Sequence, residues 1–212
     1  MKQPLLGNVA DHNDVNRMVQ QGLDHFGKID ISVSVAGIRS NKLPWEYSYE
    51  EWHEIFEINL HSTFYLVKAL APGMIERRSG CFIALGGNSA TTAASGYVAA
   101  LAASKHGVYG LIKGLARALG PYGIRANLLS LANIENNRLN PEWYTARDAN
   151  GNLIKTGQVG DPTTTDADRF KLSPLGRQGR REEVASVAVF LASDESSYVT
   201  GDRIIVAGGG YM

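Results

Sequence analysis

Apolar residues along the chain recur with two different spacings, and the alternation of these spacings predicts the elements. Short, nearly continuous apolar runs are typical of strands covered on both faces, and they occur at residues 29–36, 81–85, 124–129 and 203–207. Apolar residues at intervals of three or four positions predict helices over residues 11–27, 49–71, 95–119 and 181–191. Strands that alternate with helices predict an α/β fold with a mainly parallel sheet and helices on both of its faces.

Local signals mark the ends of these helices. Gly27 is expected to end the first helix. Ser48 and Glu51 form a capping box that opens the second helix, and Pro72-Gly73 is expected to end it. Residues 1–10 contain a short apolar run that is a candidate strand.

Length and composition indicate one globular domain over residues 1–212. The chain has 212 residues, of which 44% are hydrophobic, enough for a substantial core. Residues 131–180 are polar and lack periodicity, so we interpret them as a lid or substrate-loop insertion.

Charge and cysteine content narrow the classes of partner and compartment. The 21 basic and 21 acidic side chains balance, which argues against a nucleic-acid or membrane-surface partner. The single cysteine, Cys81, excludes an internal disulfide, and the chain has no long apolar span or leader, so we expect a cytoplasmic protein. No pair of histidines has metal-ligand spacing, and we expect no metal site.

Four segments, in their order and spacing, resemble the short-chain dehydrogenase/reductase family. They are HFGKIDISVSVAG, EWHEIFEINLHSTFYLVKALAPGM, ASKHGVYGLIKGLARALGPYGIRAN and PLGRQGRREEVASVAVFLASDESSYVTGDRIIVAGG. The resemblance covers nearly the whole chain. It implies a Rossmann-like three-layer αβα sandwich and, by ancestry, an NAD(P)-dependent oxidoreductase.

The beginning of the sequence departs from the family pattern. The family opens with a strand, a glycine-rich turn and a helix that receives the cofactor pyrophosphate, whereas this sequence has no such turn near its start. It resembles the family from the third strand onward, with Asn8-Val9 at an adenine-contacting position, so two βα units are expected to be absent. The strand at 29–36 would then be an edge. We expect residues 1–10 to pair with it, to exchange with another subunit or to lie loose, unless another chain covers the edge.

The catalytic set implied by the resemblance is incomplete. In the family a serine orients the substrate carbonyl, a tyrosine exchanges the proton, a lysine lowers the tyrosine pKa and holds the ribose, and an asparagine positions a relay water. Asn59 and Lys105 match the asparagine and the lysine, but Leu101 stands at the tyrosine position and cannot act as acid or base. The serine position falls at Asn88 by spacing, or at Gly87 by the strand pattern.

Two residues are candidate stand-ins for the missing groups. Ser89 lies one or two places from the serine position. Tyr97 lies four residues before Leu101, which is roughly 6 Å away along a helix axis. The ordinary interpretation of Tyr97 is an aromatic side chain that packs at the helix entrance.

The cofactor-binding positions are equally altered. Ser34-Val35-Ala36-Gly37 stands where the family has Asn-Asn-Ala-Gly, so only Ala36 and Gly37 are retained; Val35 can fill space but cannot replace an asparagine's hydrogen bonds. Asn136 replaces a threonine that binds the cofactor amide in the family. We interpret Ala36 and Gly37, together with Asn8, Val9 and Lys105, as a vestigial NAD(P) site.

Our leading hypothesis is therefore a degenerate, truncated family member, a pseudoenzyme that has lost hydride transfer and cofactor binding. One alternative is an active NAD- or NADP-dependent oxidoreductase acting on a hydroxyl or carbonyl substrate through an atypical site. A second is a serine hydrolase, because Gly87-Asn88-Ser89-Ala90-Thr91 nearly matches a G-x-S-x-G elbow after a strand. A third is a non-catalytic partner of a full-length relative.

Small residues on the long helix suggest an oligomer. Their positions leave little bulk on one side of residues 95–119: Ala99, Ala103, Gly107, Gly110 and Gly114. With helix 49–71, this helix forms a two-fold interface in the family, so we expect a homodimer or homotetramer. A small-molecule ligand under residues 131–180 is a further candidate partner.

Overall fold

The computed structural model describes residues 4–135, 145–148, 150–154, 165 and 173–210, and it has the predicted α/β architecture. The strands of the main sheet are β1 (Ile31–Ser34), β2 (Gly80–Leu85), β3 (Ile124–Leu131) and β6 (Arg203–Val206). The helices are α1 (His12–Phe26), α2 (Tyr49–Phe56), α3 (Ser62–Arg77), α4 (Ala99–Leu119) and α6 (Arg181–Ala192).

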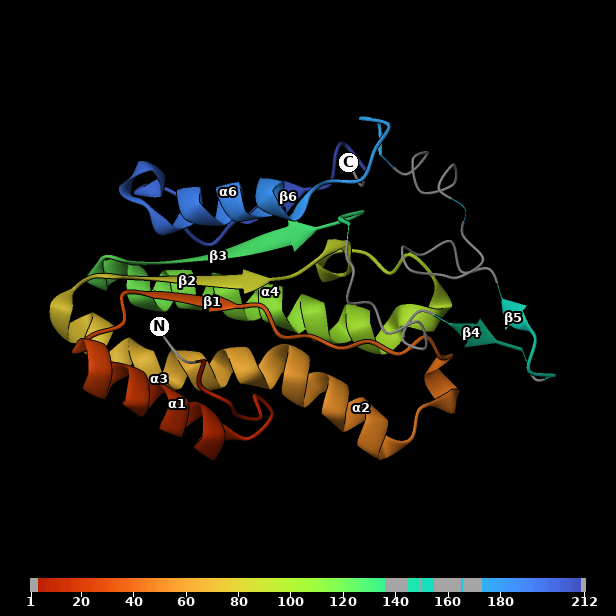
Figure 1. Ribbon diagram of the computed structural model, residues 1–212, viewed down its shortest axis with the longest axis horizontal. Coiled ribbons are helices and arrows are strands. Elements are labelled where there is room, and N and C mark those ends of the chain that lie inside the picture. Colours follow the sequence, from red (N-terminus) through yellow and green to blue (C-terminus); the bar gives the residue numbers. More distant parts are fainter. Residues whose placement is uncertain (1–3, 136–144, 149, 155–164, 166–172, 211–212) are drawn as a thin grey trace.

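The sheet lies between two helical layers. Its strand order is β1-β2-β3-β6 and every pairing is parallel. Figure 1 shows α1, α3 and α4 on one side of the sheet and α6 on the other. The parallel register aligns Ile31 with Cys81 and Leu85 with Leu129, which brings the carboxyl ends of β1, β2 and β3 to one edge of the sheet.

Each face of the sheet has its own apolar core. The larger core joins the sheet to α1, α3 and α4, and Met74, Ile112 and Leu128 are fully buried in it. The smaller core joins β2 and β3 to α6 through Ile83 and Leu191. Burial on both faces explains why β2 and β3 appear in the sequence as continuous apolar runs, whereas β1, predicted to be covered on both faces, has alternate residues exposed.

The predicted helix ends are confirmed at α1 and α2. The Asp11 carboxylate accepts a hydrogen bond from the Asn13 backbone N–H (2.8 Å), and Gly27, with φ of 77°, follows the last turn of α1. Ser48 Oγ accepts from Glu51 N (3.1 Å) while the Glu51 carboxylate accepts from Ser48 N (3.0 Å). This reciprocal box satisfies two backbone donors that the first turn of a helix otherwise leaves unpaired.

The helix predicted over residues 49–71 differs from the structure in two ways. A π-helical turn at Glu57–His61 separates α2 from α3. Pro72 does not end the helix, because α3 continues through it to Arg77. Pro72 cannot donate a backbone hydrogen bond, but Met74, two residues later, is completely buried, and its packing favours the continued helix.

β1 forms one edge of the sheet, as predicted. Ile31 and Val33 are each 44% exposed and Val35 is 60% exposed, so this edge of the sheet carries exposed apolar side chains. Residues 4–10 contain no strand and do not pair with β1. They lie against α1 instead, where Leu6 O accepts a hydrogen bond from Arg17 Nη2 (2.9 Å).

The predicted loop at residues 131–180 is only partly described. β3 extends to Leu131, and a two-stranded antiparallel sheet forms from β4 (Ala146–Arg147) and β5 (Leu153–Ile154). Most of the expected lid, including Asn136, lies outside the described residues. Among the helices that are described, none is both long enough and apolar enough to cross a bilayer.

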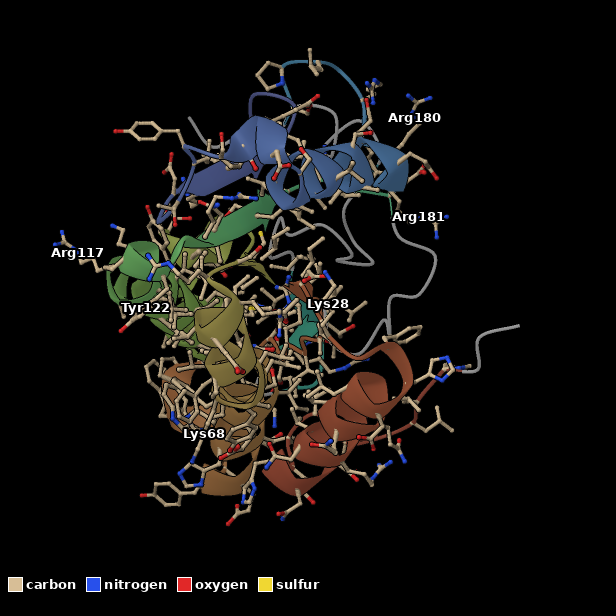
Figure 2. All side chains as sticks on the ribbon, turned by 90° about the vertical axis from the view of Figure 1, so that its left-hand side faces the viewer. Lys28, Lys68, Arg117, Tyr122, Arg180 and Arg181 are labelled. Carbon is tan, nitrogen blue, oxygen red and sulfur yellow. The ribbon has the colours of Figure 1, made fainter. Side chains whose placement is uncertain are left out.

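Basic side chains are distributed over several helices. Figure 2 shows Lys68 on α3, Arg117 near the end of α4, and Arg180 and Arg181 at the start of α6. These cations therefore belong to separate parts of the fold.

Candidate functional site

Asn59 joins the end of β1 to α4. It is 1% exposed and lies in the π-helical turn, whose extra backbone residue interrupts the regular helix. Its Nδ2 donates to Ile38 O (3.0 Å) and to Ser104 Oγ (3.0 Å), and its Oδ1 accepts from Ile38 N (2.8 Å). The carboxamide therefore bonds three protein groups, and its role in this structure is to hold the loop after β1 against α4.

Lys105 is the buried cation of the site. Its Nζ donates to Leu85 O (2.8 Å) at the end of β2, and the residue is 8% exposed. Burial lowers the pKa of Lys105 to about 8, because desolvation disfavours the charged amine. A methyl group added at Gly37 would lie 3.5 Å from Nζ and 3.2 Å from Asn59 Oδ1, so Gly37, Asn59 and Lys105 form one compact cluster.

The cluster lacks a group that could exchange a proton with a substrate at the position of Leu101. Leu101 lies in α4 about one turn before Lys105, roughly 6 Å along the helix axis. Its backbone carbonyl accepts a hydrogen bond from Ser104 Oγ (2.9 Å), but its side chain has no titratable atom. Among the described residues, Lys105 forms no ion pair with a carboxylate.

Tyr97 does not lie on α4, contrary to the prediction. It belongs to a separate 3-10 turn, Gly96–Val98, and its backbone carbonyl accepts from Lys42 N (3.1 Å). Because α4 begins only at Ala99, the helical-turn relation between Tyr97 and Leu101 does not hold in this structure. The backbone contact pins Tyr97 beside the loop at Lys42.

Asn88 and Ser89 lie in a 3-10 turn after β2. Ser89 is buried, and within the described chain no hydrogen bond joins it to a histidine. The Nδ1 atom of His106, the histidine nearest in sequence, lies 2.8 Å from Ala102 O in its own helix. Asn88 contributes its carbonyl, which accepts from Thr91 N (3.1 Å), to the geometry of the turn.

The two glycines after β2 have structural explanations. A methyl group at Gly86 would lie 2.7 Å from a methyl carbon of Leu128, so the close approach to β3 requires glycine there. Gly87 has φ of 80°, a conformation that favours glycine, and its carbonyl accepts from Ser130 Oγ (2.9 Å).

The remaining cofactor positions belong to two segments, one before α1 and one after β1. Asn8 is in the turn that enters α1, where its N–H donates to Asp14 Oδ2 (2.8 Å) and its Oδ1 accepts from Ala10 N (3.0 Å). Val9 is half-buried in the same turn. Ala36 and Gly37 follow β1, and Gly37 contacts the cluster around Lys105.

The described residues fit only part of a nicotinamide dinucleotide. An ammonium group such as that of Lys105 can donate to ribose hydroxyls. A pyrophosphate is bound at a helix N-terminus free of negative charge, but α1, α2 and α6 carry acidic side chains in their first turns, at Asp14, at Glu50 and Glu51, and at Glu182 and Glu183. The first turn of α4 has no acid, yet a loop with two 3-10 turns separates it from β2. Of the described helices, α1, α2 and α6 are thus poorly suited to receive a pyrophosphate, and α3 continues directly from the π-helical turn.

The sequence did not indicate the partners of the polar cluster. Ser104 precedes Lys105 and accepts from Asn59, a residue 45 positions earlier. Ser34 Oγ and Thr63 Oγ1 share a buried hydrogen bond (2.9 Å) that fixes β1 to α3. The only available signal was that polar residues interrupt otherwise apolar elements, a pattern that marks buried polar groups without naming their partners.

Comparison with known proteins places the chain among reductases and dehydrogenases. A family model described as enoyl-(acyl carrier protein) reductase matches residues 2–211. The 3-oxoacyl-(acyl-carrier-protein) reductase of Salmonella typhimurium is 34% identical over 208 residues, covering 98% of this chain and 77% of that protein.

Solved structures agree with this relationship. A 3-oxoacyl-(acyl-carrier-protein) reductase from Brucella melitensis with bound NAD has a TM-score of 0.79 and 32% identity, covering 99% of this chain and 71% of its own. A gluconate 5-dehydrogenase from Burkholderia cenocepacia, in complex with NADP and tartrate, has a TM-score of 0.78 and 30% identity, covering 96% and 72%.

Proposed function

This chain belongs to the short-chain dehydrogenase/reductase family, and we propose that it is a member that no longer transfers hydride and acts as a non-catalytic subunit. The observation that carries this proposal is Leu101. It stands about one helical turn before Lys105, where the family has its proton-exchanging tyrosine, and it has no ionisable atom.

The retained polar residues support the proposal because their atoms bond other parts of the protein. Reduction of a carbonyl requires a proton for the developing alkoxide as the hydride arrives. Asn59 uses both ends of its carboxamide within the protein, and Lys105 donates to Leu85 O. Tyr97, the nearest candidate replacement, lies outside α4.

We further propose that the chain does not bind NAD(P) tightly. The acidic first turns of α1, α2 and α6 would repel a pyrophosphate, and Lys105 alone offers only the ribose end of a site. Tight binding of a dinucleotide draws on both its phosphates and its ribose groups, so we expect affinity to be lost with the phosphate site.

The role that remains is assembly, either as a homodimer or homotetramer or with an intact relative. Gly110 and Gly114 are exposed on α4 and have open space where a side chain would be, so a second helix could approach closely along this side. Helices α2 and α3 would complete such an interface.

An active NAD(P)-dependent oxidoreductase is the second candidate. It is favoured by the relatives, since the Brucella melitensis reductase binds NAD and the Burkholderia cenocepacia dehydrogenase binds NADP. Its substrate would bind under residues 131–180. This candidate requires a proton donor other than the residue at position 101.

The two candidates are distinguished by assaying the wild-type chain and Leu101→Tyr side by side. NADPH and NADH oxidation is followed with a panel of small ketones and 3-oxoacyl thioesters. Our proposal predicts no turnover by either protein, because a restored tyrosine cannot act without bound cofactor. Turnover by the wild type would establish the second candidate, and turnover by Leu101→Tyr alone would show that only the proton donor had been lost.

A further inference from the structure

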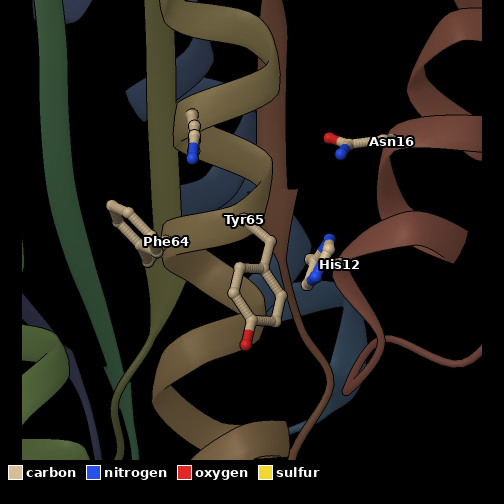
Figure 3. Close-up of a pocket in the computed structure, with 5 residues that line it drawn as sticks. His12, Asn16, Phe64 and Tyr65 are labelled. Carbon is tan, nitrogen blue, oxygen red and sulfur yellow. The ribbon is translucent and has the colours of Figure 1, made fainter.

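A hollow between α1 and α3 lies apart from the cluster around Lys105, and three of its lining residues belong to α3. It has a volume of about 140 Å³ and is lined by His12 and Asn16 from α1 and by Phe64, Tyr65 and Lys68 from α3. Figure 3 shows Tyr65 at its centre, with His12 and Asn16 on one side and Phe64 on the other. A cavity of roughly this size holds a single benzene-sized ring.

The aromatic part of the hollow offers a surface for a flat apolar group. The rings of Tyr65 and His12 are held edge to face, with centroids 5.8 Å apart. Phe64 is 45% exposed, a large fraction for a phenyl side chain with one face on the protein. Aromatic rings prefer edge-to-face or offset contacts, so a third ring is the natural complement to this arrangement.

The polar part of the hollow offers hydrogen-bond donors. Lys68 and Asn16 line the same space, and neither side chain has a hydrogen bond or ion pair with any other described residue. An ammonium and a carboxamide N–H₂ together match a carboxylate, which has two acceptor oxygens.

Two acidic residues act on Tyr65, Glu57 and Asp11, and neither lines the hollow. The Tyr65 hydroxyl donates to Glu57 Oε2 (2.8 Å), and Glu57 Oε1 lies 2.9 Å from His61 Nδ1. Glu57 precedes Lys68 by eleven residues, about 16 Å along the helix axis. The Glu57 carboxylate is therefore already bonded, and the Asp11 carboxylate accepts a hydrogen bond from Asn13 N (2.8 Å).

We propose that the hollow binds a small aromatic carboxylate, with its ring against Tyr65 and Phe64 and its carboxylate at Lys68 and Asn16. The site is independent of NAD(P) and of the cluster around Lys105. A ligand of this size that contacts one exposed charge should bind in the millimolar range.

The test is a nuclear magnetic resonance titration of the full chain with benzoate, benzyl alcohol and benzylamine. We expect saturable shifts of the His12 and Tyr65 ring signals with benzoate, and binding that is about fivefold weaker for benzyl alcohol and weaker still for benzylamine. Lys68→Met should weaken benzoate binding by the same factor of about five and leave benzyl alcohol binding unchanged.

Lys113→Met is the matched control, since Lys113 is another helical lysine that lies against a tyrosine ring, 4.3 Å from the centroid of Tyr109. It should not alter benzoate binding. The proposal is overturned if benzoate causes no saturable shifts at His12 and Tyr65, if benzylamine binds as tightly as benzoate, or if the two lysine variants affect benzoate equally.

Discussion

Replacing Lys105 by methionine should stabilise the folded chain at neutral pH. A pKa lowered from 10.5 to about 8 means that folding disfavours the charged amine by about 3 kcal/mol. Methionine keeps an unbranched stem of similar length without the charge. It also removes the hydrogen bond from the charged amine to Leu85 O, a loss of about 1.5 kcal/mol. The expected net gain in the free energy of unfolding is about 1.5 kcal/mol at pH 7.

The pH dependence has a definite sign. Between pH 8 and pH 10.5 the unfolded chain still holds a proton on this lysine while the folded chain has lost it. The free energy of unfolding of the wild type therefore rises with pH across this window through Lys105, and that of Lys105→Met lacks this contribution. The gain in the free energy of unfolding from Lys105→Met is complete below about pH 8 and disappears as the pH approaches 10.5.

Urea unfolding of both proteins at intervals from pH 7 to pH 10.5 measures the difference. Lys113→Met controls for the loss of one positive charge. Its difference in stability from the wild type should not change with pH in the way expected for Lys105→Met. If Lys105→Met were less stable than the wild type at pH 7, with a difference independent of pH, the ammonium would have a favourable partner and its description as a desolvated cation would be wrong.

Three further substitutions, one of them paired with a control variant, test the site, the sheet and the interface. Asn59→Leu should cost about 2–4 kcal/mol in the free energy of unfolding, because buried groups at both ends of the carboxamide lose their partner; a cost below about 0.5 kcal/mol would contradict the bridging role. Gly86→Ala should cost about 1–3 kcal/mol by overlap with Leu128, whereas Gly120→Ala, which has open space, should not destabilise the chain; equal effects in urea titrations would refute the packing argument. Gly110→Leu should leave the fold intact but reduce the mass measured by light scattering, and an unchanged mass would remove α4 from the interface.

The fold was predictable because periodicity reports burial directly. The runs at residues 81–85 and 124–129 became β2 and β3 with only small changes in length, and the box at Ser48 and Glu51 formed as expected. The π-helical turn and the continuation through Pro72 were not predictable, since both depend on tertiary packing around Asn59 and Met74.

The sequence predicted which residues belong to the candidate site but not how they contact one another. The resemblance identified Asn59, Lys105 and Leu101, and the structure places the first two beside Gly37. It could not identify Ser104 as a partner of Asn59, because no local pattern encodes a contact between residues 45 positions apart. The error at Tyr97 arose from assuming that helical geometry began before Ala99.

Equilibrium titration with NADPH and NADH, followed by nicotinamide fluorescence, tests the central claim most directly. Binding of the dinucleotide depends on a phosphate site, which we propose this chain has lost. The titration can be made without knowing the substrate. Our account predicts no saturable change in fluorescence with either cofactor, for the wild type and for Leu101→Tyr alike. Micromolar binding of either cofactor to the wild-type chain would contradict it.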